Sequence, residues 1–112
     1  MYAILWEFRV PAERRAEFET AYGPDGPWAL LFAKAAGLVG VELLRRTEQA
    51  VRYLTIDRWR SRRSFEKFKD GFSAEYEALD RKLEGIADSE TRIGAFDALL
   101  PGSDAGGAAR SS

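Results

Sequence analysis

The order of two hydrophobic periodicities along this chain limits the folds that are open to it. Residues 2–10, 38–46 and 52–59 alternate with a period of two, which is typical of β-strands. Residues 12–22 and 61–83 instead carry apolar side chains at the spacing of one helix face. The chain therefore begins with the order strand, helix, strand, strand, helix.

Local signals predict where these elements begin and end. The first helix is followed by Tyr-Gly-Pro-Asp-Gly-Pro-Trp at residues 22–28. Within it, Asp25 is expected to cap a short second helix that has Pro27 in its first turn. Gly37 is expected to end that helix in a left-handed conformation. Ser61 is expected to cap the long helix that follows the third strand.

The C-terminal part of the chain adds one strand and a tail. Gly71 and Ser73 predict a break within the long helix, and residues 92–99 read as a last strand. Residues 101–112 consist mainly of Gly, Ala and Ser and hold no large apolar residue, so we expect a disordered tail. Residues 1–100 are then the only folded domain predicted.

The assembled order is βαββαβ, which predicts an α+β fold of the ferredoxin-like type. In this arrangement a four-stranded antiparallel sheet has its helices on one face. The first strand places aromatic and aliphatic residues on one face but also has Ala3 and Leu5 on the other. An apolar second face on such a sheet marks an interaction surface. We therefore expect a homodimer that packs sheet against sheet with two-fold symmetry.

The residue types that are missing exclude several classes of chemistry. The chain has no histidine, cysteine or asparagine. Nucleophilic catalysis by Ser-His-Asp or Cys-His is excluded, and so is a zinc site of Cys or His ligands. Glu13, Glu17 and Glu19 are expected to face solvent instead of holding a metal ion.

Charge and hydropathy give further expectations about partners and location. The net charge is −1, and seven arginines between residues 45 and 63 would be spread over two sheet faces, so no nucleic-acid partner is expected. No apolar run approaches the length of a membrane helix, so no membrane partner is expected either. Without cysteine nothing requires an oxidising compartment, and cytoplasm is the expected location.

Several segments together carry a resemblance to a known family. The chain resembles the antibiotic-biosynthesis-monooxygenase type of domain, within the dimeric α/β-barrel superfamily, over about residues 1–99. The resemblance rests on Tyr-Ala-Ile-Leu-Trp-Glu-Phe-Arg-Val at 2–10, the turn at 22–28, Leu-Val-Gly-Val-Glu-Leu-Leu-Arg at 38–45, and Tyr-Leu-Thr-Ile-Asp-Arg-Trp at 53–59 leading into Ser-Phe-Glu at 64–66.

This resemblance implies a pocket between sheet and helices in each subunit of a face-packed dimer. Members of the superfamily include cofactor-free oxygenases of polycyclic phenols, haem-degrading enzymes, isomerases and proteins of no known activity. Haem-degrading members rely on a pocket histidine helped by asparagine, and this chain has neither. The resemblance therefore implies no cofactor here and a substrate that is aromatic or polyketide-like.

Five residues are candidates for the site. Tyr22 and Asp57 are expected to act on the substrate, binding or deprotonating a phenol, with Asp57 as a base of raised pKa. Trp28, Tyr53 and Trp59 are expected to bind the substrate and exclude water. Each has a structural alternative: core packing for the tryptophans, a half-buried ring for Tyr22, and an ion pair with an arginine or a turn cap for Asp57. Two functions stay open, a cofactor-independent monooxygenase and a non-catalytic small-molecule-binding or structural dimer.

Overall fold

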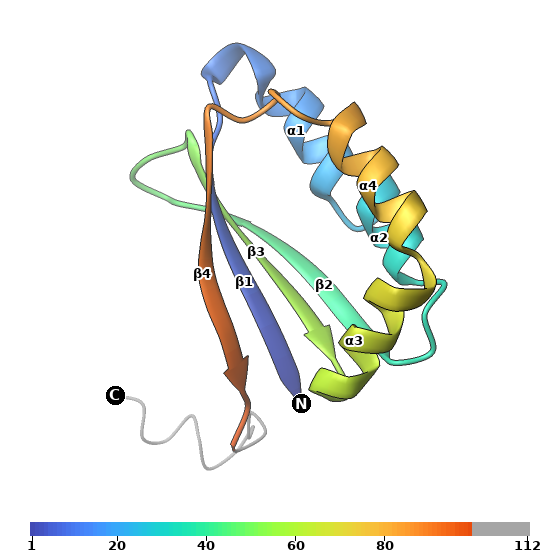
Figure 1. Cartoon of the computed structure of the whole chain (residues 1–112). Coiled ribbons are helices and arrows are strands. Elements are labelled where there is room, and N and C mark those ends of the chain that lie inside the picture. Colours follow the sequence, from blue (N-terminus) through green and yellow to red (C-terminus); the bar gives the residue numbers. More distant parts are fainter. Residues whose placement is uncertain (100–112) are drawn as a thin grey trace.

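A four-stranded antiparallel sheet forms one layer of the molecule (Figure 1). The computed structural model describes residues 1–99. The strands are β1 (Tyr2–Arg9), β2 (Leu38–Arg45), β3 (Arg52–Trp59) and β4 (Ser89–Asp97), and they lie in the order β2-β3-β1-β4. The central strands β1 and β3 pair over their full length, from Tyr2 opposite Trp59 to Arg9 opposite Arg52.

The helices form the second layer and cover one face of this sheet (Figure 1). They are the 3-10 turn η1 (Ala12–Arg14) and the α-helices α1 (Arg15–Tyr22), α2 (Pro27–Phe32), α3 (Arg62–Gly71) and α4 (Ser73–Lys82). The predicted ferredoxin-like α+β fold is therefore confirmed. The predicted tail at residues 101–112 lies outside the described residues. Among residues 1–99, no helix is both long and apolar enough to cross a membrane.

The core between the two layers is built mainly from aromatic rings. Around one half of the sheet, Trp59 and Phe68 are almost fully buried, and their ring centroids lie 5.1 Å apart. Around the other half, the ring of Phe18 packs against Phe8 and Tyr53, with centroid distances of 5.1 Å and 4.8 Å. These contacts hold α1 and α3 against opposite ends of the sheet, and the space between them becomes the pocket described below.

Two of the predicted boundary signals are wrong. The N-cap of α2 is Gly26 and it makes no side-chain cap, while Asp25 is exposed. Gly37 does not adopt a left-handed backbone conformation. Among the described residues, only Gly85 and Gly94 have a positive φ. Gly37 is instead required for space, since a Cβ atom at this position would overlap the Cβ of Ser64.

Other boundary signals are confirmed. The Ser61 hydroxyl accepts a hydrogen bond from the Ser64 backbone N–H at 3.1 Å, which caps α3. The predicted break lies at Phe72, between α3 and α4. The last strand begins at Ser89, earlier than predicted, and pairs with β1 as far as Arg9 across a register shift between Leu5 and Trp6.

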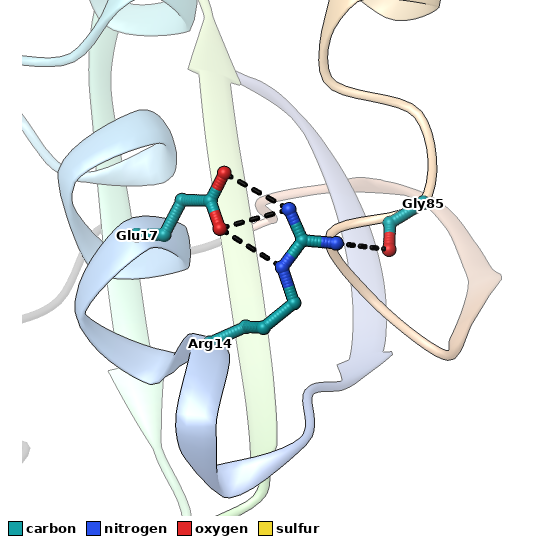
Figure 2. Close-up of polar contacts among 3 residues, drawn as sticks. All are labelled: Arg14, Glu17 and Gly85. Carbon is teal, nitrogen blue, oxygen red and sulfur yellow. Dashed lines mark hydrogen bonds and ion pairs between the residues drawn. The ribbon is translucent and has the colours of Figure 1, made fainter.

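One arginine joins the start of the helical layer to its end. Arg14 holds the carboxylate of Glu17 through two side-chain nitrogens and donates to the carbonyl of Gly85 at 2.9 Å (Figure 2). Gly85 follows α4, so this contact fixes the turn that leads into β4 beside α1. Glu17 is exposed to solvent, as expected, and it also forms an ion pair with Arg14.

The sheet face that the helices leave open is apolar at its centre. The register places Leu5 opposite Ile56, and Leu44 opposite Leu54, on this face. Phe96 of β4 lies beside them and is 48% exposed. Polar groups surround the centre, among them the ion pair between Arg58 and Glu42.

Candidate functional site

A pocket of about 80 Å³ lies between the sheet and the helices. It is smaller than typical sites for drug-sized ligands, which start near 300 Å³. Aromatic rings make up most of its wall, and they come from β1, α1, α2 and α4: Trp6, Phe8, Tyr22, Trp28, Phe32 and Tyr76. The pocket therefore favours a flat, largely apolar molecule or part of one.

Carboxylates line the same pocket. Asp57, Asp80 and Glu90 are among its lining residues, and none of the described lining residues is a lysine or an arginine. Glu42 also borders the pocket, but its carboxylate pairs with Arg58 on the open face of the sheet. Asp57, Asp80 and Glu90 make no ion pair with any residue in the range 1–99. The site thus combines an aromatic wall with unneutralised negative charge.

Asp57 occupies the middle of the helix-facing side of the sheet. In β3 it lies opposite Ile4 of β1 and opposite Val41 of β2, so its neighbours across the sheet are aliphatic. It makes no hydrogen bond to another described side chain, and the ion pair with an arginine that was its structural alternative is not formed. Burial raises the pKa of Asp57 to about 7. A carboxyl group with this pKa exchanges a proton readily near neutral pH, as a general base requires.

Two tyrosines in the pocket stay neutral over the physiological range. Burial raises the pKa of Tyr22 to about 12, and the carboxylates of Glu90 and Asp80 act in the same direction while the nearby Trp28 indole opposes them. Burial likewise raises the pKa of Tyr76 to about 12. Both hydroxyls are therefore hydrogen-bond donors and not phenolates. The ring of Tyr22 stacks on Phe18 at 4.3 Å, which holds it at the pocket edge.

Trp28 brings a polar group to the aromatic wall without a partner for it. The residue is 9% exposed, and its indole Nε1 lies near enough to the Tyr22 hydroxyl to lower the pKa of Tyr22, yet it makes no hydrogen bond of normal geometry to any described residue. The ring lies 5.0 Å from Tyr76 in an edge-on arrangement. A buried N–H that lacks an acceptor is costly, so an acceptor oxygen on a ligand would stabilise this side of the pocket.

Three of the five predicted site residues line the pocket, and the other two lie outside it. Tyr22, Trp28 and Asp57 line the pocket. Trp59 is 0% exposed and packs against Phe68 in the core. Tyr53 is 2% exposed, and its hydroxyl donates to Glu19 on the side of α1. Tyr53 and Trp59 therefore do not line the pocket. They pack in the core, one on each side of Asp57 along β3.

Tyr76, Asp80 and Glu90 also line the pocket, although they were not predicted as site residues. Tyr76 was assigned to an apolar helix stripe, and Asp80 lies one helical turn after it, so the i, i+4 spacing was an available signal. Glu90 was placed in the loop before the last strand, and only the earlier start of β4 brings it opposite Phe8. In the described part of the chain, no group of three or more acidic residues could hold a metal ion.

Comparison with models of known protein families shows the family to which this chain is related. The profile of the antibiotic biosynthesis monooxygenase family matches residues 1–79 of the chain. The chain belongs to the antibiotic biosynthesis monooxygenase family. No curated protein is a significant match. The earlier resemblance is therefore confirmed at the level of the family.

Solved structures with the same fold include proteins of different chemistry. SnoaB from Streptomyces nogalater, described as a cofactor-independent oxygenase, matches as a mutant with 24% identity and a TM-score of 0.67, over 89% of this chain and 94% of its own. MhuD, solved with two manganese protoporphyrin IX molecules per active site, matches with 20% identity and a TM-score of 0.72, over 93% of this chain and 100% of its own. At these identities the likeness establishes the shared fold.

Proposed function

We propose that this family member is a cofactor-independent monooxygenase-like protein that acts on an aromatic or polyketide-like small molecule. The observation that carries the proposal is the unpaired carboxyl of Asp57, whose pKa lies near 7 inside an aromatic pocket. A base of this kind can remove a proton from an activated phenol or from the CH₂ group that its ring activates. The resulting electron-rich anion is the species that reacts with O₂ without a cofactor.

The overall reaction balances with substrate and O₂ alone. A ring CH₂ group becomes C=O, one oxygen atom enters the product and the other leaves as water. Asp57 accepts the proton that starts the reaction and returns it when water forms. Tyr22 and the Trp28 indole N–H donate hydrogen bonds to the substrate oxygen, where negative charge develops. Trp6 and Tyr76 exclude bulk water.

The size of the pocket narrows the substrate. A volume of about 80 Å³ is smaller than the roughly 150 Å³ of a cavity that holds benzene, so no more than one aromatic ring can enter, and only with some displacement of the wall. A polycyclic substrate requires displacement of wall residues such as Tyr22 or Tyr76, which lie at the pocket edge on α1 and α4. We therefore place a single phenolic ring, or one ring of a larger molecule, against Asp57.

The residues of the pocket do not fit haem. The chain has no histidine to serve as an axial ligand. Tyrosine is an alternative ligand in some haem proteins, but a pocket of about 80 Å³ is far smaller than the sites of ligands of even drug size, and a porphyrin is larger still. We therefore propose a reaction without cofactor, unlike the porphyrin complex described for MhuD.

We also propose that the protein is a homodimer in the cytoplasm. The open sheet face offers Leu5, Ile56, Leu54 and Leu44 at its centre with polar groups around them, which is the usual anatomy of an interface. A second copy packed on this face would bury those side chains with two-fold symmetry. The pocket lies on the other face of the sheet, so the dimer leaves it accessible.

A second candidate function is non-catalytic binding of a small molecule by the same dimer. The absence of histidine and asparagine from the chain and the small pocket favour it. In this case Asp57, Tyr22 and Trp28 would recognise a ligand without transforming it.

Oxygen uptake over a panel of hydroxylated anthrones, quinols and single-ring phenols tests the enzyme proposal. We expect uptake above the buffer rate for at least one compound, and a loss in Asp57→Asn and Tyr22→Phe proteins that remain folded. Uptake at the buffer rate for every compound, with ligand binding still detectable, would favour the non-catalytic alternative.

A further inference from the structure

The charges around the pocket are distributed unevenly along it. Asp80 of α4 and Glu90 of β4 lie at the end near Phe8, where Glu90 pairs in register with Phe8. Burial raises the pKa of Glu90, and the nearby carboxylates of Asp80 and Glu84 raise it further. Both Asp80 and Glu90 are exposed to solvent, and neither forms an ion pair with a described residue.

Two cations lie near the pocket without forming an ion pair with Asp80 or Glu90. Arg92 of β4 lies opposite Trp6 in the sheet and is close enough to lower the pKa of Tyr76, yet it does not line the pocket. Lys69 of α3 places its Nζ 3.8 Å from the ring centroid of Tyr76 and also remains outside the lining. A ligand cation would therefore meet carboxylates without competition from a lysine or arginine in the wall.

Aromatic walls add to the attraction for a cation. The faces of Trp, Tyr and Phe rings attract ammonium groups, by about 0.5–2 kcal/mol per contact. The contact between Lys69 and Tyr76 shows that this ring accepts an ammonium from outside the pocket. At the other end, the unpartnered Nε1 of Trp28 is a buried hydrogen-bond donor, which calls for an acceptor oxygen on the same ligand.

We propose that the ligand of this pocket is an amine-bearing phenol, with its protonated amine near Asp80 and Glu90 and its hydroxyl near Asp57 and Trp28. The inference rests on the proposed function, because it takes the same pocket as the binding site. It goes further by naming the charge of the substrate. A cationic amine offsets the carboxylates, whereas an anionic ligand would be repelled by all three unpaired acids.

The register gives the separation of the two ends. Asp57 lies opposite Ile4, and Glu90 lies opposite Phe8, four residues further along β1. Four residues of a strand extend about 13 Å, and Asp57 and Glu90 lie on the strands to either side of β1, which adds two strand spacings of about 4.8 Å each. The proposed ligand therefore runs diagonally across the sheet, with its ring at the Asp57 end and its alkyl amine extended toward Asp80 and Glu90.

Three phenols of matched shape test this proposal: tyramine, 4-propylphenol and 3-(4-hydroxyphenyl)propionate, which are cationic, neutral and anionic at pH 7.5. Binding is measured by calorimetry and by quenching of tryptophan fluorescence. We expect tyramine to bind at least about tenfold more tightly than 4-propylphenol, and the propionate most weakly. Equal affinity for all three, or tighter binding of the propionate, would overturn the charge assignment and leave the pocket as an aromatic site.

Neutral variants locate the effect. Asp80→Asn and Glu90→Gln are each expected to reduce the preference for tyramine over 4-propylphenol, while Asp70→Asn, an exposed change on α3 outside the pocket, leaves it unchanged. A preference that survives in the double variant would contradict the proposed position of the amine. Failure of all three phenols to bind at millimolar concentration would count against both the charge assignment and the pocket as the functional site.

Discussion

The hydroxyl of Tyr53 lies 2.5 Å from a carboxylate oxygen of Glu19, and this bond joins the middle of the sheet to α1. Arg45 of β2 approaches the same carboxylate at 3.3 Å. The hydrogen bond from Tyr53, followed by the charge of Arg45, lowers the pKa of Glu19 even though burial acts against it. Tyr53 thus links the sheet to α1, and it does not line the pocket.

Substitution of Tyr53 should lower the stability of the protein without changing its affinity for a ligand. Tyr53→Phe removes the bond to Glu19 and keeps the buried ring, so we expect a loss of about 1 kcal/mol in the free energy of unfolding. Ligand affinity should stay at the wild-type value. Urea denaturation and calorimetric titration measure the two effects, and a large loss of affinity at full stability would place Tyr53 in the site after all.

The loss of stability in Tyr53→Phe should depend on pH, because it involves the ionised form of Glu19. The pKa of Glu19 is lowered by folding, so its contribution is present above the unfolded value of 4.5 and disappears as the pH falls through the folded value. The difference in stability between wild type and Tyr53→Phe should therefore shrink below pH 4.5. A difference that grows on acidification would contradict the bond to an ionised Glu19.

The opposite sign is expected for Asp57. Its pKa rises from 3.8 to about 7 on folding, so the folded state binds the extra proton and loses stability as the pH increases from 4 to 7. Asp57→Asn removes this penalty, and we expect the variant to exceed wild type by roughly 1–3 kcal/mol at pH 8 but by much less at pH 4. Thermal melts at both values, with Asp70→Asn as control, measure the effect. A variant less stable than wild type at pH 8 would show that the carboxylate is paired.

The contrast between these two acids shows how far the sequence alone could reach. Period-two and helical spacing predicted the sheet, the helices and their order, because these patterns follow from which face of an element is buried. The pattern also put Asp57 and Tyr53 on the same strand face. It could not distinguish their surroundings, since the partners of each residue come from α1, α2 and α4, which are distant in the chain.

The start of β4 and the role of Gly37 were also missed, because both depend on contacts with distant parts of the chain. The sequence pattern could not show that β4 begins at Ser89, because the register shift opposite Leu5 and Trp6 arises from pairing with β1. Without it, Glu90 was left outside the site. Likewise Gly37 was interpreted through its own backbone, whereas its role depends on Ser64 of another element.

A glycine substitution tests that tertiary contact. Gly37→Ala would bring a methyl group into Ser64 at the start of α3, and we expect a loss of about 1–3 kcal/mol. Gly71→Ala meets no atom within 4 Å at the end of the same helix and should be neutral or slightly stabilising. Chemical denaturation compares the two, and a neutral Gly37→Ala would refute the close contact.

A charge on the open sheet face should prevent dimer formation. We expect wild type to behave as twice its 12.6 kDa mass in light scattering, and Ile56→Lys to behave as a monomer. Leu30→Lys makes the same chemical change on α2 at a position that is already 61% exposed, and it should remain dimeric. A wild-type protein of 12.6 kDa at micromolar concentration would contradict the proposed interface.

The most direct test of the central claim, that Asp57 is the base of an oxygen-dependent reaction, is the rate of oxygen uptake against pH with the best phenolic substrate. The claim predicts that the wild-type rate rises with pH through about 7 and then levels, because the ionised form of Asp57 is the active one. Asp57→Asn should lose about 10²–10⁴-fold at every pH while Asp70→Asn stays active. Wild-type uptake by Asp57→Asn, or a rate that does not change with pH around 7, would contradict it.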